Sequence, residues 1–168
     1  PEVLDYMRMF PMEPIEFKAI SSNVKSYESK VYFADESMLD IFTVAMLDDQ
    51  AISKFSEPFK LIISESVAEK YFGKTDVVGE TFIFARDARP LEVVAVMHDS
   101  PQNTHIKYDV LISHATLPIV QSWYKENLWN ANNEYTFLLM NDGVDLVDFN
   151  QKLEKYSADN VQMEGEIV

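Results

Sequence analysis

The sequence predicts a mixed α+β domain, and two observations support this fold class. Short apolar segments of strand composition alternate with helical segments along the chain. Many of the predicted strands are also joined by short polar bends, as at 86–90 between 81–85 and 91–97. Such bends are typical of hairpins, whereas a doubly wound parallel sheet needs long crossover connections.

The clearest helix signal lies between two capping residues. Ser64 is a good N-cap, and Glu65 follows in the first turn, where the helix dipole favours a negative charge. Gly73 stands where a left-handed residue ends a helix. The sequence therefore predicts a helix between Ser64 and Gly73, directly after a strand at 59–63.

The remaining elements follow from periodicity and turn residues. Further strands are expected at 15–20, 31–34, 108–112 and 135–140, and helical turns at 37–42, 50–55 and 115–125. Residues 1–14 combine Met7, Met9 and Met12 with prolines, which suggests a short helix and an irregular turn. Asp145 is expected to cap a last helix with a buried stripe, formed by Leu146, Phe149, Leu153 and Tyr156.

Composition excludes several classes of protein. An apolar share of 47% allows a real core, so we expect a folded domain rather than disorder. The net charge of −14 repels phosphate backbones and argues against nucleic-acid binding. The absence of cysteine excludes disulfides, cysteine-ligated zinc and a thiol nucleophile. The four glycines form neither a P-loop nor a dinucleotide-binding motif.

The sequence offers no convincing catalytic or metal site. His98, Asp99 and His105 share one polar loop, which could hold zinc or copper, but a loop fixed by side-chain hydrogen bonds and Pro101 is the favoured explanation. Ser64 and Ser66 lack the setting of a catalytic serine. We therefore expect no catalytic residue, no cofactor and no bound metal.

Two side-chain clusters have a structural and a functional interpretation. Met7, Met9 and Met12 could handle copper, although closely spaced methionines more often fill a core. The aromatic residues Trp123, Tyr124 and Trp129 could form a docking surface, but packing between lobes is the favoured explanation.

The two ends suggest a fragment. The chain opens at Pro1 without an initiator methionine and stops at Val168 in a segment of strand-like composition. The longest apolar run, 93–97, is far shorter than a membrane span of roughly 20 residues. We expect such spans to lie on either side of this sequence.

Four segments together carry a resemblance to a known family. They are "VYFADESMLDIFTVAMLDD", "LIISESVAEKYFGKTDVVGETFIF", "LEVVAVMHDSPQNTHIKYDVLIS" and "NEYTFLLMNDGVDLVDFNQKLEKY", which cover most of residues 30–157. Their order and spacing resemble the MacB-like periplasmic core domain of MacB/FtsX-type ABC transporter permeases. Residues 1–29 and 158–168 match weakly.

The resemblance implies a two-lobed architecture. Residues 1–57 and 115–168 would form a porter-like lobe, and residues 58–114 a smaller, inserted Sabre-like lobe. The chain would pass between the lobes near Ser56–Pro58 and Ser113–Pro118, so these two segments are expected to act as hinges.

The resemblance also implies a mechanical function at the periplasmic face of the inner membrane. The domain would transmit ATP-driven motion so that a substrate is exported, with ATP hydrolysed in a separate cytoplasmic subunit or domain. Its partners would be its own transmembrane helices, the ATPase, a second permease copy, and an adaptor or a lipoprotein, peptide or drug substrate. Nothing in the sequence indicates where an adaptor would dock. A free-standing periplasmic ligand- or metal-binding module is the alternative.

Overall fold

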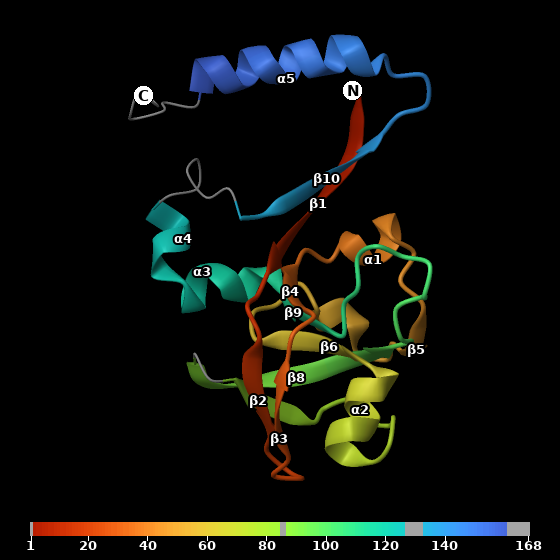
Figure 1. Cartoon of the computed structure of the whole chain (residues 1–168), viewed down its shortest axis with the longest axis vertical. Coiled ribbons are helices and arrows are strands. Elements are labelled where there is room, and N and C mark those ends of the chain that lie inside the picture. The colour runs from red at the N-terminus through yellow and green to blue at the C-terminus, as the bar shows by residue number, and fades with distance from the viewer. Residues whose placement is uncertain (1, 85–86, 127–132, 161–168) are drawn as a thin grey trace. The chain divides into compact units, whose positions relative to one another are not determined.

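The computed structural model describes residues 2–84, 87–126 and 133–160 (Figure 1). By its internal contacts the chain divides into two compact units. We call Met7–Phe137 the body, and Pro1–Tyr6 with Leu138–Val168 the terminal unit. Two predicted features, Trp129 in the aromatic cluster and the strand-like segment at the end of the chain, lie outside the described residues.

The described strands form one mixed sheet in the order β10-β1-β4-β9-β6-β8-β7-β2-β3, with β5 paired to β8. They are β1 (Val3–Pro11), β2 (Ile15–Ala19), β3 (Lys25–Glu28), β4 (Val31–Ala34), β5 (Met46–Asp48), β6 (Lys60–Ser64), β7 (Thr81–Phe84), β8 (Asp87–Met97), β9 (Val110–Ser113) and β10 (Tyr135–Met140). The pairs β4–β9 and β6–β8 are parallel, whereas β7–β8 and β2–β3 are antiparallel hairpins. The predicted α+β class and the hairpin at 81–97 are confirmed.

The helices are short except for the last one. They are α1 (Met38–Ile41), α2 (Glu65–Phe72), α3 (Leu117–Val120), α4 (Ser122–Glu126) and α5 (Leu146–Asn160), with 3₁₀ turns η1 (Ile52–Lys54) and η2 (His114–Thr116). Each lies within a segment that the sequence predicts to be helical or at its border. Pro118 falls in the first turn of α3, where its missing N–H costs nothing.

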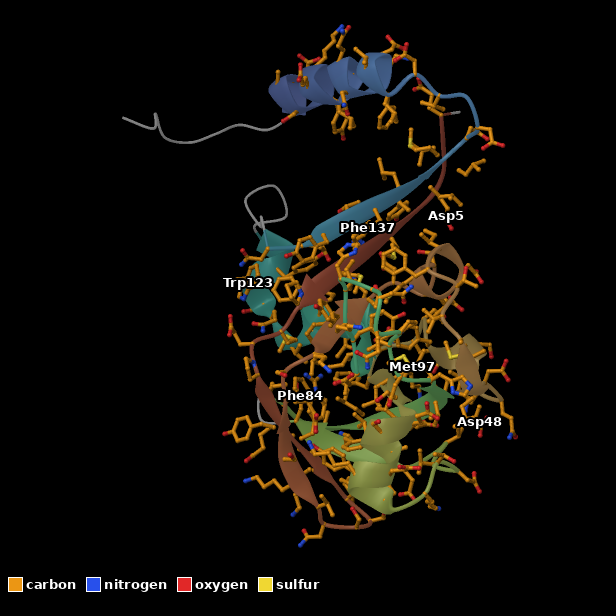
Figure 2. All side chains as sticks on the ribbon, turned by 45° about the vertical axis from the view of Figure 1, so that its right-hand side comes forward. Asp5, Asp48, Phe84, Met97, Trp123 and Phe137 are labelled. Atoms are coloured by element: carbon orange, nitrogen blue, oxygen red, sulfur yellow. The ribbon has the colours of Figure 1, made fainter. Side chains whose placement is uncertain are left out.

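Two apolar clusters pack on opposite faces of the central strands. Leu61 and Ile63 of β6 belong to the first cluster with α2, whereas Ile62 belongs to the second with α1 and η1. Because successive side chains of a strand point to opposite faces, β6 must be apolar at consecutive positions to serve both clusters. Met97, which Figure 2 labels, belongs to the second cluster.

The caps predicted for α2 are confirmed. The Ser64 hydroxyl accepts a hydrogen bond from the Val67 N–H at 3.3 Å, and Gly73 adopts φ +69°. Tyr71 then fixes the helix to β3, since its hydroxyl donates to the Glu28 carboxylate at 2.7 Å. Lys70 pairs with the same carboxylate at 2.7 Å, so the buried charge of Glu28 is compensated.

The predicted helix within residues 1–14 is wrong, because this segment contains strand β1. Met7 and Met9 are two residues apart, so they point to the same face of β1, where both are fully buried. Pro11 is tolerated because it ends the strand. The core-filling interpretation of the methionines is the one that the structure supports.

The terminal unit departs from prediction in one respect. Asp145 caps α5 as predicted, accepting a hydrogen bond from the Val147 N–H at 2.8 Å. The predicted buried stripe is wrong, however, since Leu146 is 61% and Leu153 43% exposed and Phe149 is only half-buried. Helical periodicity identified the apolar face of α5, but it could not show whether anything covers that face.

The sheet runs through both predicted lobes without interruption. The β2–β3 hairpin, from the predicted porter-like lobe, pairs through β2 with β7 of the predicted inserted lobe. Figure 1 shows the two strands of this hairpin side by side. The lobe boundaries at 57 and 115 stay a prediction. Within the described ranges, no helix has the length and apolar character needed to cross a bilayer.

Candidate functional site

A partly buried network of charged and polar side chains is the best candidate site in the body. We call Arg8, Asp35, His114, Tyr124 and Glu134 the anchor network. The Arg8 guanidinium binds Asp35 in a two-pronged pair, with Nε 2.8 Å and Nη2 3.0 Å from the two carboxylate oxygens. The backbone N–H of Arg8 also donates to Asp35, at 3.0 Å. Such a fork fixes orientation as well as charge.

His114 joins this pair to a second carboxylate. Its ring is 5% exposed, with Nε2 hydrogen-bonded to Glu134 and Nδ1 3.8 Å from Asp35. The Tyr124 hydroxyl donates to the other oxygen of Glu134 at 2.9 Å and lies 3.2 Å from His114 Nε2. Each ring nitrogen of His114 therefore faces a carboxylate.

The electrostatics of the anchor network keep its donors protonated. The hydrogen bond with Asp35 raises the pKa of Arg8, so the fork is always charged. Burial, followed by the hydrogen bond to Glu134, raises the pKa of Tyr124 to about 12, so its hydroxyl remains a donor at neutral pH. Across the described residues, no buried side-chain nitrogen or oxygen lacks a partner. The geometry of the anchor network is thus suited to holding several elements together.

The anchor network connects five parts of the body. Arg8 comes from β1, Asp35 follows β4, His114 follows β9, Tyr124 lies on α4, and Glu134 directly precedes β10. β1 and β10 are neighbours in the sheet. The two strands that lead toward the ends of the chain are therefore held to the central sheet through one set of charges.

The second predicted hinge segment contacts the residue that directly follows the first. The backbone N–H of Phe59, directly after 56–58, donates to the hydroxyl of Thr116 at 2.8 Å, and Thr116 is fully buried. Phe59 adopts φ +62°, which is unusual for a residue with a bulky side chain. The Arg89 guanidinium lies 4.5 Å from the centre of its ring. Phe59 is thus a strained residue that directly follows the predicted hinge segment at 56–58.

The loop of His98 and Asp99 is used to hold α2. Asp99 accepts hydrogen bonds from the N–H and hydroxyl of Ser66, while Glu65 accepts one from the Asp99 N–H at 3.3 Å. His98 Nδ1 lies 3.4 Å from Glu65. Among the described residues, no group of three or more His, Asp or Glu side chains could hold a metal ion. These contacts fit the explanation that hydrogen bonds fix the loop.

His105 instead lines a hollow beside the loop. The hollow has a volume of about 540 Å³ and lies between 41–45 and 98–108, with Phe42, Val44, Ile106 and Tyr108 on its walls. It is mainly apolar and opens to solvent. Its size would suit a small ligand, but in the described residues its histidines do not form a metal site.

The aromatic cluster is formed in part by residues that the sequence did not single out. Trp123 and Tyr124, on α4, pack against Phe10 of β1 with ring centres 6.0 and 6.5 Å apart (Figure 2 labels Trp123). Tyr124 is buried, whereas Trp123 is 36% exposed. The cluster joins α4 to β1 beside the anchor network.

The sequence prediction missed the anchor network entirely. Its pairs are far apart in the chain, since Asp35 comes 27 positions after Arg8 and Glu134 comes 20 positions after His114. No local spacing could indicate them. The one available signal was that His114 lies next to an apolar strand, where a polar side chain needs a partner.

Solved structures with the same fold are domains of proteins described as permeases or transporters. A domain of a protein described as a permease from Porphyromonas gingivalis is 22% identical, with a TM-score of 0.78, over 98% of this chain and 67% of its own. The periplasmic region of MacB from Actinobacillus actinomycetemcomitans is 13% identical (TM-score 0.67; 94% and 67% covered). The extracellular domain of the noncanonic ABC-type transporter YknZ from Gram-positive bacteria is 15% identical, with a TM-score of 0.61, over 95% of this chain and 76% of its own. A search of curated proteins gave no significant match.

The match to a family model then identifies the chain. Residues 8–156 match the model of the MacB-like periplasmic core domain, and the chain belongs to that family. It is the periplasmic domain of a MacB-like ABC transporter permease, which confirms the resemblance seen in the sequence. The family consists of transporter domains and not of enzymes.

Proposed function

We propose that the domain transmits ATP-driven motion from the membrane to the periplasm, so that a substrate is exported or handed over there. ATP would be hydrolysed by a cytoplasmic subunit or domain, and two permease copies would work together. Transmembrane helices on either side of this sequence would move β1 and α5. Adaptors, lipoproteins, peptides and drugs are the candidate partners.

The anchor network carries this proposal. Movement that enters through β1 or β10 reaches the central sheet only if those strands cannot slide along it. Arg8 on β1 and Glu134 before β10 are tied by buried charges to residues that follow β4 and β9. These charges are partly buried, so separating them would leave each without its partner and only partly hydrated.

Relative motion of the predicted lobes would centre on the crossings at Ser56–Pro58 and Ser113–Pro118, and the strand pairs β2–β7 and β4–β9, which join the lobes, would limit its amplitude. Phe59, held in a strained conformation, and its hydrogen bond to Thr116 support this location, since strain persists where the surroundings enforce it. The division into residues 1–57 with 115–168 and residues 58–114 is part of this proposal.

The test is a distance measurement on the full-length permease with its ATPase. A spin label at the exposed Ser22, in the β2–β3 turn, would report the separation of two copies with and without trapped ATP. We expect the separation to change, and we expect R8M/D35L to abolish that change while ATP hydrolysis continues. The matched control is E16L/K25M, which removes an exposed pair of 2.9 Å. An unchanged distance in the parent protein would refute the proposal.

The hollow beside the 98–108 loop supports a second candidate function, a free-standing module that binds a small ligand. The neighbouring gene sequence separates the two. The transporter hypothesis predicts an apolar run of roughly 20 residues before Pro1 and others after Val168. Flanks without such runs would favour the module, and metal found by elemental analysis of protein purified without chelator would favour its metal-binding form.

A further inference from the structure

The terminal unit has an apolar surface that its own residues do not cover. None of its described residues is buried. Leu146 and Leu153 of α5 are 61% and 43% exposed, and they share one helical face with Phe149. A 15-residue helix is marginally stable in water without packing. The stability of α5 therefore requires a further packing partner.

The neighbouring strand presents a second open surface. β10 stands at one end of the sheet and pairs with β1, and in the described part of the chain no strand pairs with its other side. Its sequence, YTFLLM, has neither a charge nor a proline. Exposed edges usually carry such residues to prevent pairing with other strands. β10 thus has the composition of a strand that is paired on both sides.

The order of the elements indicates which strand would fit. β10 leads through the turn at 141–145 into α5, and this order is the one in which a strand–helix–strand unit begins. In such units the second strand lies parallel to the first, and the helix packs its apolar face on the sheet. Because β1 already occupies one side of β10, a parallel strand has the open side available.

The relatives supply the length of chain that this requires. The Porphyromonas and Actinobacillus domains match nearly all of this chain, and yet a third of each lies outside the match. We propose that the open edge of β10 and the apolar face of α5 receive a parallel strand of the same polypeptide, from the part of the domain that residues 1–168 do not include. This inference is independent of the proposed mechanical function.

Hydrogen exchange tests the strand directly. We expect backbone amides of β10 to exchange at least about 100-fold more slowly in the full-length permease than in residues 1–168 alone, because paired amides exchange only on opening. The amides of β3, at the other end of the sheet, are the control and should exchange equally in both. Equal exchange of β10 in both proteins would overturn the proposal. So would protection in residues 1–168 that grows with protein concentration, since a second copy would then be the occupant.

A matched pair of variants tests the helix face. L153D places a charge on the apolar face of α5, and Q151D places the same charge on the opposite face. We expect L153D to lower the Tm of the intact domain, with its remaining third, by at least about 4 °C, and that of residues 1–168 by less than about 1 °C. Q151D should leave both Tm values within about 1 °C. An equal loss for L153D and Q151D, or no loss for L153D in the intact domain, would contradict the proposal.

Discussion

The body and the terminal unit differ in what stabilises them. The body buries two apolar clusters on opposite faces of its central strands and compensates its buried charges. The described part of the terminal unit buries no residue, and its polar contacts, such as Lys152 with Glu2 at 2.8 Å, lie at the surface. The body is therefore a stable scaffold within residues 1–168, whereas the terminal unit is a connection that depends on other structure.

A pair of leucine truncations gives the largest expected difference between the two units. Leu111 of β9 is fully buried in the second cluster, whereas Leu153 is 43% exposed. L111A should lower the free energy of unfolding of residues 1–168 by about 3 kcal/mol. L153A should change it by less than about 0.5 kcal/mol. Urea unfolding followed by circular dichroism measures both. A cost of more than about 1 kcal/mol for L153A would erase the contrast between the units.

The anchor network offers the next largest effect. R8M removes the fork on Asp35 and should cost about 2 kcal/mol of unfolding free energy, after allowance for the partial exposure of the Arg8 side chain. R8K keeps the charge but loses the two-pronged geometry, so we expect a smaller loss. Urea unfolding gives both values. If R8K costs nothing, the geometry of the fork does not contribute, and if R8M costs no more than R8K, the charge that lysine retains does not contribute.

The cap of α2 should give a smaller, local effect. S64A removes the hydroxyl that accepts the Val67 N–H and should cost about 1 kcal/mol. The exposed Ser22 provides the control, because S22A should be nearly neutral in the same urea unfolding measurement. A neutral S64A would mean that the contacts of Asp99 and Glu65 hold the start of the helix without the cap.

The smallest effect concerns the dependence of stability on pH. The hydrogen bond from Lys60, at 2.6 Å, lowers the pKa of Glu92 below its ordinary value of 4.5. The ionised form is thus favoured in the folded state, and its contribution is present above pH 4.5 and lost as the pH falls through the lowered pKa. E92Q should cost about 0.5 kcal/mol at neutral pH, since the pair is partly exposed. The difference from the parent should vanish in acid, as urea unfolding from pH 7 to 3 would show. A difference that persists in acid would exclude this mechanism.

The features that the sequence predicted correctly depend on neighbours in the chain. Ser64 and Gly73 mark the ends of α2 because caps act within one turn, and the 81–97 hairpin follows from two strands and a bend. Strand β1 was missed because its partner β4 lies more than twenty residues away and because methionines and prolines dominate its neighbourhood.

The candidate site was less predictable than the fold. Arg8 and His114 form their hydrogen bonds only because the folded sheet brings Asp35 and Glu134 beside them. The apolar face of α5 shows a further limit of sequence-based prediction. Periodicity predicts that Leu146 and Leu153 pack against another element, but it does not identify that element. A surface that the rest of a polypeptide must complete cannot be predicted from the part at hand.

The methionines of the second cluster give the domain a built-in chemical reporter. Met7 and Met9 on β1 lie in the same cluster as Met38 and Met97, and all four are essentially inaccessible to solvent. A thioether is oxidised to a sulfoxide only when an oxidant reaches it, and outside the cytoplasm oxidants are common. If β1 lifts from the sheet during a transport cycle, Met7 and Met9 gain oxygen, and mass spectrometry can time that movement without any introduced label.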